Sequence, residues 1–238
     1  MLKSFVDRLV ALAAPTTVEV DGSVYSNQEL VFIKDKKPMP RCIELTGLDS
    51  VCKMVRNEAE HIGLQIFIQV KDYKNVSVFT SLDGDEDRLY LYKCNADTPC
   101  VTIGRFHPYE NAVIELRSLY IPNEDTTYLL QLLSSITSES KVVSNDNGVT
   151  QSVEAKQGIA LSQMVAIKPR VALQPFRTFV EVEQPKSEFL LRISQKGEIG
   201  LYEADGGVWK LEATRNIAGY FEEALKDLID AGVVVVIR

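Results

Sequence analysis

The sequence predicts an α+β fold of mainly antiparallel sheets with about five helices, including a long C-terminal helix followed by a terminal strand. Three observations lead to this expectation. Segments with strand-like alternation come in runs joined by short turns, which is typical of antiparallel sheets rather than of a doubly wound parallel sheet. Amphipathic helical segments are grouped between these runs. Hydrophobic residues make up 45% and charged residues 25% of the 238 residues, which is the balance of a chain with a packed core.

The first forty residues predict a helix followed by strands. Residues 4–13 carry apolar residues near helical spacing, and Pro15 ends this segment. Residues 17–20 alternate as a strand does, and Asp21-Gly22 is a typical hairpin turn. The remaining segments are strands over 24–25 and 30–33 and a charged loop over 34–41.

A second helix is expected to open at Thr46, because Thr46 and Asp49 have the spacing of a capping box. Gly63 is expected to end it. Its apolar face comprises Leu48, Val51, Cys52, Val55 and Ala59. A three-strand meander follows over 64–70, 76–81 and 88–94, with polar turns at 72–75 and 83–87.

Two more helices are expected after the meander. Pro108 suits the first turn of one of them, whose apolar face is Ala112, Val113, Leu116 and Leu119. The other runs over 123–137, with Glu124 and Asp125 near the positive end of its dipole.

The rest of the chain is predicted to be rich in strands before it ends in a helix and a strand. The expected strands are 149–155, 160–167, 170–173, 176–182, 188–193 and 198–202. The final helix over 209–230 is expected to turn Leu211, Ile217, Phe221, Leu225 and Leu228 inward, and Gly232 stops it. The terminal strand 233–237 is apolar throughout and is expected to be covered on both faces.

The turn-forming cluster 144–148 is the predicted boundary between two halves. Residues 1–143 form an N-terminal α+β half, and residues 144–238 form a strand-rich half with the long helix. One continuous domain is the alternative.

The charge and cysteine content restrict the partners and the compartment. A net charge of −7 and a pI of about 5.0 argue against direct nucleic-acid binding. No apolar run is long enough to cross a membrane, and no secretory signal is recognisable, so we expect a cytoplasmic protein without a membrane partner. Its four cysteines are then expected to be reduced, with a Cys94–Cys100 disulfide as the alternative.

Patterns for catalysis or metal binding are absent from the sequence. The acidic turn 83–87 does not have the ligand spacing of a calcium loop. Cys94, Cys100 and His107 do not have zinc-site spacing, and a fourth ligand is not evident. Neither a nucleophile motif nor a glycine-rich phosphate loop occurs. The sequence therefore predicts no catalytic residue, metal or cofactor, and favours a non-enzymatic function.

Six residues are candidates for binding a small ligand. Alternation over 176–182 places Arg177 on one face with Glu181 and Glu183, and Arg192 on a nearby strand could join it to read a carboxylate or a phosphate. A charge lattice on the protein surface is the alternative. The other four candidates are Asp205, Gly206, Gly207 and Lys210.

The turn Asp205-Gly206-Gly207 precedes the final helix, where backbone N–H groups favour anions. A strand-to-helix turn capped by Asp205 is the alternative. Pro175 and Pro185 either mark the two ends of the expected strand 176–182 or keep it at the edge of a sheet. An edge strand would allow pairing with another copy of the chain.

Seven segments resemble a family of hypothetical proteins from tailed phages and prophages, distantly similar to the YfdQ-like prophage proteins. They are Leu45-Thr-Gly-Leu48, Gly104-Arg-Phe106, Asp146-Asn-Gly-Val-Thr-Gln151, Lys156-Gln-Gly-Ile-Ala160, Leu173-Gln-Pro-Phe-Arg-Thr-Phe179, Glu183-Gln-Pro185 and Glu203-Ala-Asp-Gly-Gly-Val-Trp-Lys-Leu-Glu-Ala213. The resemblance spans roughly residues 45–225. It implies a phage-encoded protein in the cytoplasm of a bacterial host, and it carries over no catalytic residue.

Three functions remain open from the sequence. The first is a non-enzymatic binding or assembly protein that forms homo-oligomers and contacts a phage or host protein. The second is a small-ligand or nucleotide-binding protein that sequesters a host defence signal. The third is an accessory factor in phage DNA replication or recombination, acting through proteins more than through DNA.

Overall fold

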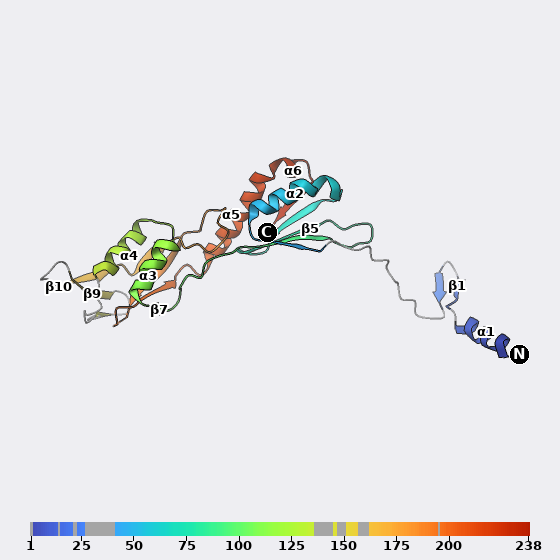
Figure 1. Ribbon diagram of the computed structural model, residues 1–238, viewed down its shortest axis with the longest axis horizontal. Coiled ribbons are helices and arrows are strands. Elements are labelled where there is room, and N and C mark those ends of the chain that lie inside the picture. The colour runs from blue at the N-terminus through green and yellow to red at the C-terminus, as the bar shows by residue number, and fades with distance from the viewer. Residues whose placement is uncertain are drawn as a thin grey trace. The chain divides into compact units, whose positions relative to one another are not determined.

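The computed structural model describes residues 2–13, 15–20, 23–26, 41–135, 145–146, 151–156, 162–194 and 196–238. The chain forms two compact units, Met1–Met39, called here the N-terminal unit, and Pro40–Arg238, called the main unit. Helices and mostly antiparallel strands occur in groups, so the predicted α+β class is confirmed (Figure 1). Within the described part of the chain, no helix combines the length and the apolar character that crossing a membrane requires.

The N-terminal unit contains a helix and a hairpin, as the sequence predicts. Helix α1 covers Leu2–Ala13, and strands β1 (Thr17–Val20) and β2 (Ser23–Ser26) pair antiparallel. The expected strand 30–33 lies outside the described residues, and so does the expected loop over 34–41, except for Arg41.

A five-stranded sheet, called the large sheet, forms one part of the main unit. Its strand order is β14-β4-β5-β6-β3, with an antiparallel meander in the centre and a parallel strand at each edge. The strands are β3 (Ile43–Leu45), β4 (Ile66–Val70), β5 (Asn75–Thr80), β6 (Tyr90–Asn95) and β14 (Val234–Ile237). The meander is confirmed, whereas the short strand β3 was not expected from the sequence.

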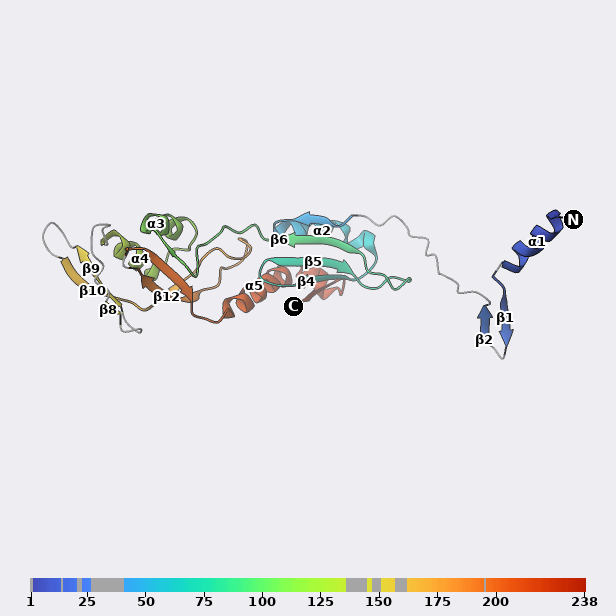
Figure 2. The same ribbon diagram turned by 90° about the horizontal axis from the view of Figure 1, so that it is seen from below.

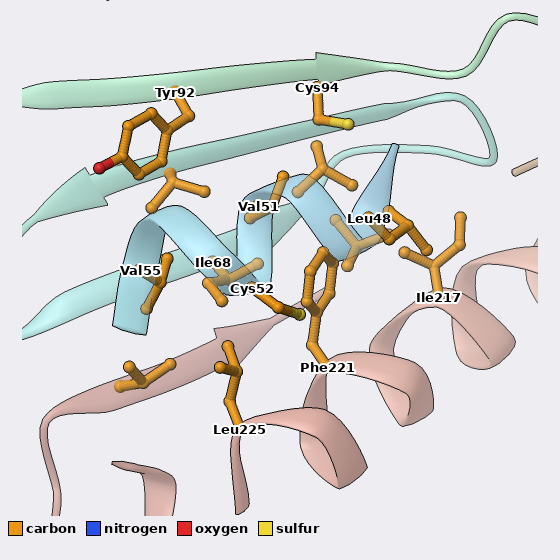
Figure 3. Packing of buried hydrophobic residues seen from close by; sticks show 14 of the residues in the cluster. Leu48, Val51, Cys52, Val55, Ile68, Tyr92, Cys94, Ile217, Phe221 and Leu225 are labelled. Carbon is orange, nitrogen blue, oxygen red and sulfur yellow. The ribbon is translucent and has the colours of Figure 1, made fainter. Parts of the chain in front are cut away.

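Helices α2 (Leu48–Ile62), α5 (Val208–Ala224) and α6 (Lys226–Asp230) lie on one face of the large sheet (Figures 1 and 2). The predicted apolar face of α2 is fully buried against it, and Gly63 ends α2 with a φ of 63°. Phe221 of α5 points toward Leu48 and Cys52 of α2 (Figure 3). This first core also contains Phe179 and Val182, which come from a loop rather than from a regular element.

A four-stranded antiparallel sheet, called the small sheet, carries the second core. Its order is β11-β12-β13-β7, and helices α3 and α4 contribute the other half of the core. The strands are β7 (Phe106–His107), β11 (Arg170–Leu173), β12 (Ser187–Ile193) and β13 (Ile199–Glu203), and the helices are α3 (Tyr109–Ser118) and α4 (Glu124–Ser135). All of these except β7 match predicted elements.

Strands β8 (Asn145–Asp146), β9 (Gln151–Lys156) and β10 (Ser162–Ile167) form a third sheet within the main unit. The predicted boundary 144–148 lies outside the described residues, except for Asn145 and Asp146. Both cores contain residues from before and after this boundary. The division into halves 1–143 and 144–238 stays a prediction.

Five local predictions are wrong. Thr46 does not cap α2, whose N-cap is Gly47 without a side-chain cap of its own. Residues 176–182 form an irregular loop instead of a strand. The final helix is interrupted at Leu225, and Leu211 is exposed rather than turned inward. Strand β14 is an edge strand, so only Val234 is fully buried and the next three residues are half-buried.

Candidate functional site

The main unit contains a cavity of about 320 Å³, a size that suits a small organic ligand. Four segments of the chain meet there. They are the β4–β5 turn, the segment between β6 and β7, the loop between β11 and β12, and the end of β13 with the start of α5. The lining residues are Tyr73, Lys74, Thr98, Pro99, Cys100, Val101, Ile103, Arg177, Glu203, Trp209 and Lys210.

Arg177 is the most buried charged group at this cavity, with only 7% of its side chain exposed. Its Nη1 donates to Glu203 Oε1 at 2.8 Å, and its Nη2 donates to the hydroxyl of Ser187. The guanidinium carbon lies 3.7 Å from the centre of the Trp209 ring. Burial lowers the pKa of Arg177, and the Glu203 carboxylate opposes that shift, so the guanidinium stays charged.

The third nitrogen of Arg177 has no such partner. Its Nε is buried and finds no hydrogen-bond acceptor among the described residues. A buried N–H of a charged group costs free energy when it is left unsatisfied. Arg177 also lines the cavity, where its positive charge favours an anionic group.

The loop that carries Arg177 is held by the side chain of Gln184. Gln184 Oε1 accepts the backbone N–H groups of Arg177 and Thr178 at 3.0 and 3.2 Å. Its Nε2 donates to the carbonyl oxygens of Phe179 and Val182 at 2.8 and 3.2 Å. The Gln184 side chain therefore satisfies backbone groups that a neighbouring strand would satisfy in a β-sheet. The predicted strand 176–182 does not form because this side chain takes the place of a strand partner.

The expected pairing of Arg177 with Glu181 or Glu183 is wrong for the same reason. Without a strand, residues 177 and 181 do not share a face, and Arg177 pairs with Glu203 instead. Glu181 reaches α2, where its Oε1 accepts the backbone N–H of Leu48 at 2.8 Å. This contact replaces the predicted capping box of Thr46 and Asp49, and Asp49 bonds to Lys53.

Aromatic side chains form one wall of the cavity. Tyr73 and Trp209 meet edge to face with ring centres 4.7 Å apart. Trp209 Nε1 donates to Glu203 Oε1 at 3.1 Å, so one carboxylate fixes both Trp209 and Arg177. Thr178 Oγ1 donates to the carbonyl of Tyr73 at 2.5 Å and joins the Arg177 loop to the β4–β5 turn.

Two lysines add positive charge at the cavity. The Nζ atom of Lys74 lies 5.7 Å from the Tyr73 ring centre, and that of Lys210 lies 5.7 Å from the centres of both Tyr73 and Trp209. Within the described residues neither lysine forms an ion pair, in contrast to Arg177. The lining thus carries three cations and one carboxylate, and this local excess of positive charge favours an anion.

Of the six candidates from the sequence, the structure brings Arg177 and Lys210 to the cavity. Asp205, Gly206 and Gly207 form the turn before α5, where the Asp205 carboxylate accepts the Gly207 N–H at 3.0 Å. Both glycines have positive φ angles of 64° and 83°, which suit only glycine well. In the sequence these three residues lie between the lining residues Glu203 and Trp209, but they do not line the cavity themselves.

Arg192 lies elsewhere. It faces Gly200 across β12 and β13, and its neighbours Leu191 and Ile193 point to the opposite face, into the second core. Arg192 does not line the cavity.

Sequence reasoning missed Tyr73, Lys74, Glu203 and the segment from Thr98 to Ile103 as site residues. No local pattern marks them, since they reach the cavity only through the arrangement of the two sheets. Trp209 is the exception, because it is the single tryptophan of the sequence and follows Gly206-Gly207 after one residue.

The residues considered for metal binding or disulfide formation have other contacts or remain free thiols. The Asp83 carboxylate accepts the backbone N–H groups of Asp85 and Asp87, so the acidic turn closes on itself. Cys94 and Cys100 are free thiols, one buried and one exposed, and burial raises the pKa of Cys94 to about 12. In the described part of the chain, no group of three or more His, Cys, Asp or Glu side chains is placed to hold a metal ion.

No family model, curated protein or solved structure matches this chain.

Proposed function

We propose that this is a binding protein whose cavity beside Trp209 takes a small anionic ligand of the nucleotide class. The observation that carries the proposal is the buried guanidinium of Arg177, which lies against the Trp209 ring and lines the cavity. Lys74 and Lys210 add two more cations at the lining. The cavity combines positive charge with a volume that suits a small ligand. The role that we propose for it is binding rather than catalysis.

The chemistry of the lining supports a ligand with two parts. An anionic group is favoured near Arg177 and the lysines, where charge-assisted hydrogen bonds are strongest. A planar or apolar part is favoured by the side chains of Tyr73, Pro99, Val101 and Ile103. A nucleoside phosphate has both parts, and this agrees with the nucleotide-binding function that the sequence left open.

Titration calorimetry of the full chain with adenosine monophosphate, adenosine and inorganic phosphate tests this proposal. We expect saturable binding of the monophosphate, with adenosine and phosphate each at least tenfold weaker. Lys210→Ala should weaken the binding, and Arg192→Ala is the matched control because Arg192 does not line the cavity. Failure of all three compounds to bind, or an equal loss with Arg192→Ala, would contradict the proposal.

Self-association is the second candidate function. It is favoured by the unpaired outer edges of the large sheet, where β14 and β3 have no further strand partner among the described residues. Open edges can pair with another chain. A native mass spectrum that shows only the monomer at micromolar concentration would speak against it.

A phage origin, a host cytoplasmic location and a protein partner of phage or host stay proposals from the sequence resemblance. A role in phage DNA replication or recombination is a further one, and the net charge of −7 favours action through proteins. Binding of single-stranded DNA that weakens steeply with salt would favour direct contact with DNA instead.

A further inference from the structure

The hairpin of the N-terminal unit has one apolar face that is open to solvent. The register pairs Val18 with Tyr25 and Val20 with Ser23, so Val18, Val20 and Tyr25 point to the same side. All three are at least half exposed, at 58%, 50% and 58%. The opposite side carries Thr17, Glu19, Val24 and Ser26, and only Val24 is apolar there. The hairpin is therefore amphipathic.

Helix α1 adds an exposed aromatic side chain to the N-terminal unit. Phe5 is 64% exposed in the structure.

These elements are too small to be stable while exposed. A two-stranded hairpin alone is marginal in water, and an isolated helix of this length is marginal too. The hairpin has no third strand within the described residues. Its apolar face therefore needs a covering surface.

The charge of the unit points to a second copy as that surface. Residues 1–39 contain five basic and five acidic residues, so their formal charge is zero, and the whole excess of −7 falls on residues 40–238. Two N-terminal units can therefore approach each other without net repulsion, whereas the rest of the chain repels its own copies. An identical apolar patch on each copy is what a twofold interface requires.

We propose that the N-terminal unit is the self-association module of this protein, and that two copies pack together through the Val18–Val20–Tyr25 face and Phe5 of α1. This inference rests on the proposed self-association and adds the segment that performs it. Because the contact is apolar and the unit is neutral, association should persist at high salt.

Sedimentation of the full chain at micromolar concentration tests the proposal with matched variants. The wild-type chain should sediment at a multiple of 26.6 kDa. Val18→Asp should shift it to the monomer, whereas Val24→Asp, the same change on the opposite side of the hairpin, should not. On the helix, Phe5→Asp should shift it and Ser4→Asp should not. Unchanged Trp209 fluorescence would show that the main unit stays folded in each variant.

Two results would overturn the inference, and they differ in what they mean for self-association. A wild-type monomer would remove both the module and the self-association. A wild-type oligomer whose mass is unaffected by Val18→Asp and Phe5→Asp would remove only the module and place the contact in the main unit. Loss of the oligomer with Val24→Asp as readily as with Val18→Asp would also contradict it.

Discussion

At the level of single residues, a glutamate from a distant loop caps the N-terminus of α2, where the sequence predicts a local capping box. Glu181 accepts the first backbone N–H of α2 from a position 133 residues away. Gly47 leaves the room for it, since a Cβ atom there would lie 2.8 Å from Glu181 Oε1. The φ of Gly47 is −126°, which any residue adopts, so the glycine is needed for space rather than for its backbone conformation. No local pattern could predict this contact.

Glu181→Ala should destabilise the protein by about 1 kcal/mol, the usual cost of losing a helix N-terminal cap. Gly47→Ala should cost a similar amount, because it displaces the same carboxylate. The double variant should then cost less than the two single variants together, since both remove one contact. Urea unfolding followed by Trp209 fluorescence measures these free energies. Additive effects, or an equal loss from the control Glu183→Ala, would refute the shared contact.

Asp125 gives a prediction for pH. Burial would raise its pKa, but hydrogen bonds from the Ala172 N–H at 2.7 Å and from Lys168 outweigh this and lower it. The folded state thus prefers the ionised carboxylate. Its contribution is complete above the ordinary pKa of 3.8 and is lost as the pH falls through the lowered pKa of the folded protein.

Asp125→Asn should therefore cost about 1–2 kcal/mol near neutral pH. The difference in unfolding free energy between wild type and variant should shrink as the pH falls below about 4. Urea unfolding across this pH range measures it. Glu124→Gln is the control in the same helical turn. A difference that stays constant down to acid pH would show that the charge of Asp125 is not the cause.

At the level of elements, the segment 174–186 shows why a correct pattern can mislead. Residues 176–182 alternate as a strand does, yet Phe179 and Val182 enter the first core while Arg177 turns toward Glu203. Four hydrogen bonds from one buried amide, Gln184, stabilise this shape. Sequence alternation cannot reveal a side chain that replaces a sheet partner.

Gln184→Leu keeps the size of the side chain and removes its hydrogen bonds. It should destabilise the protein by about 1–3 kcal/mol, because buried backbone groups lose their partners. It should also weaken ligand binding, since the loop positions Arg177. The exposed Gln131→Leu serves as the control for both measurements, made by urea unfolding and by calorimetry. Retention of full stability and affinity in Gln184→Leu would contradict this role.

At the level of the whole molecule, the sequence predicts the elements better than their assembly. Periodicity identified α2, the meander and strands β11 to β13, because apolar spacing reflects which face of each element is buried. It did not reveal that β14 returns parallel to β4, or that residues on both sides of 144–148 share both cores. These arrangements depend on contacts between distant segments.

The sequence marks some of the residues that line the cavity and not others. Arg177 was a candidate because of the alternation over 176–182, and Lys210 because of the double glycine before the final helix; both line the cavity. Arg192 does not line the cavity, and its place depends on which face of β12 meets the core. Tyr73 and Lys74 lie in the β4–β5 turn, which is joined to the Arg177 loop by a hydrogen bond from Thr178 that no local pattern indicates.

The most direct test of ligand binding is a native mass spectrum of the untagged protein, as purified and after incubation with a mixture of nucleoside phosphates. We expect one anionic adduct on each 26.6 kDa subunit, and we expect it to be absent from the double variant Lys74→Ala with Lys210→Ala. A bare subunit before and after incubation, or the same adduct on the double variant, would contradict it.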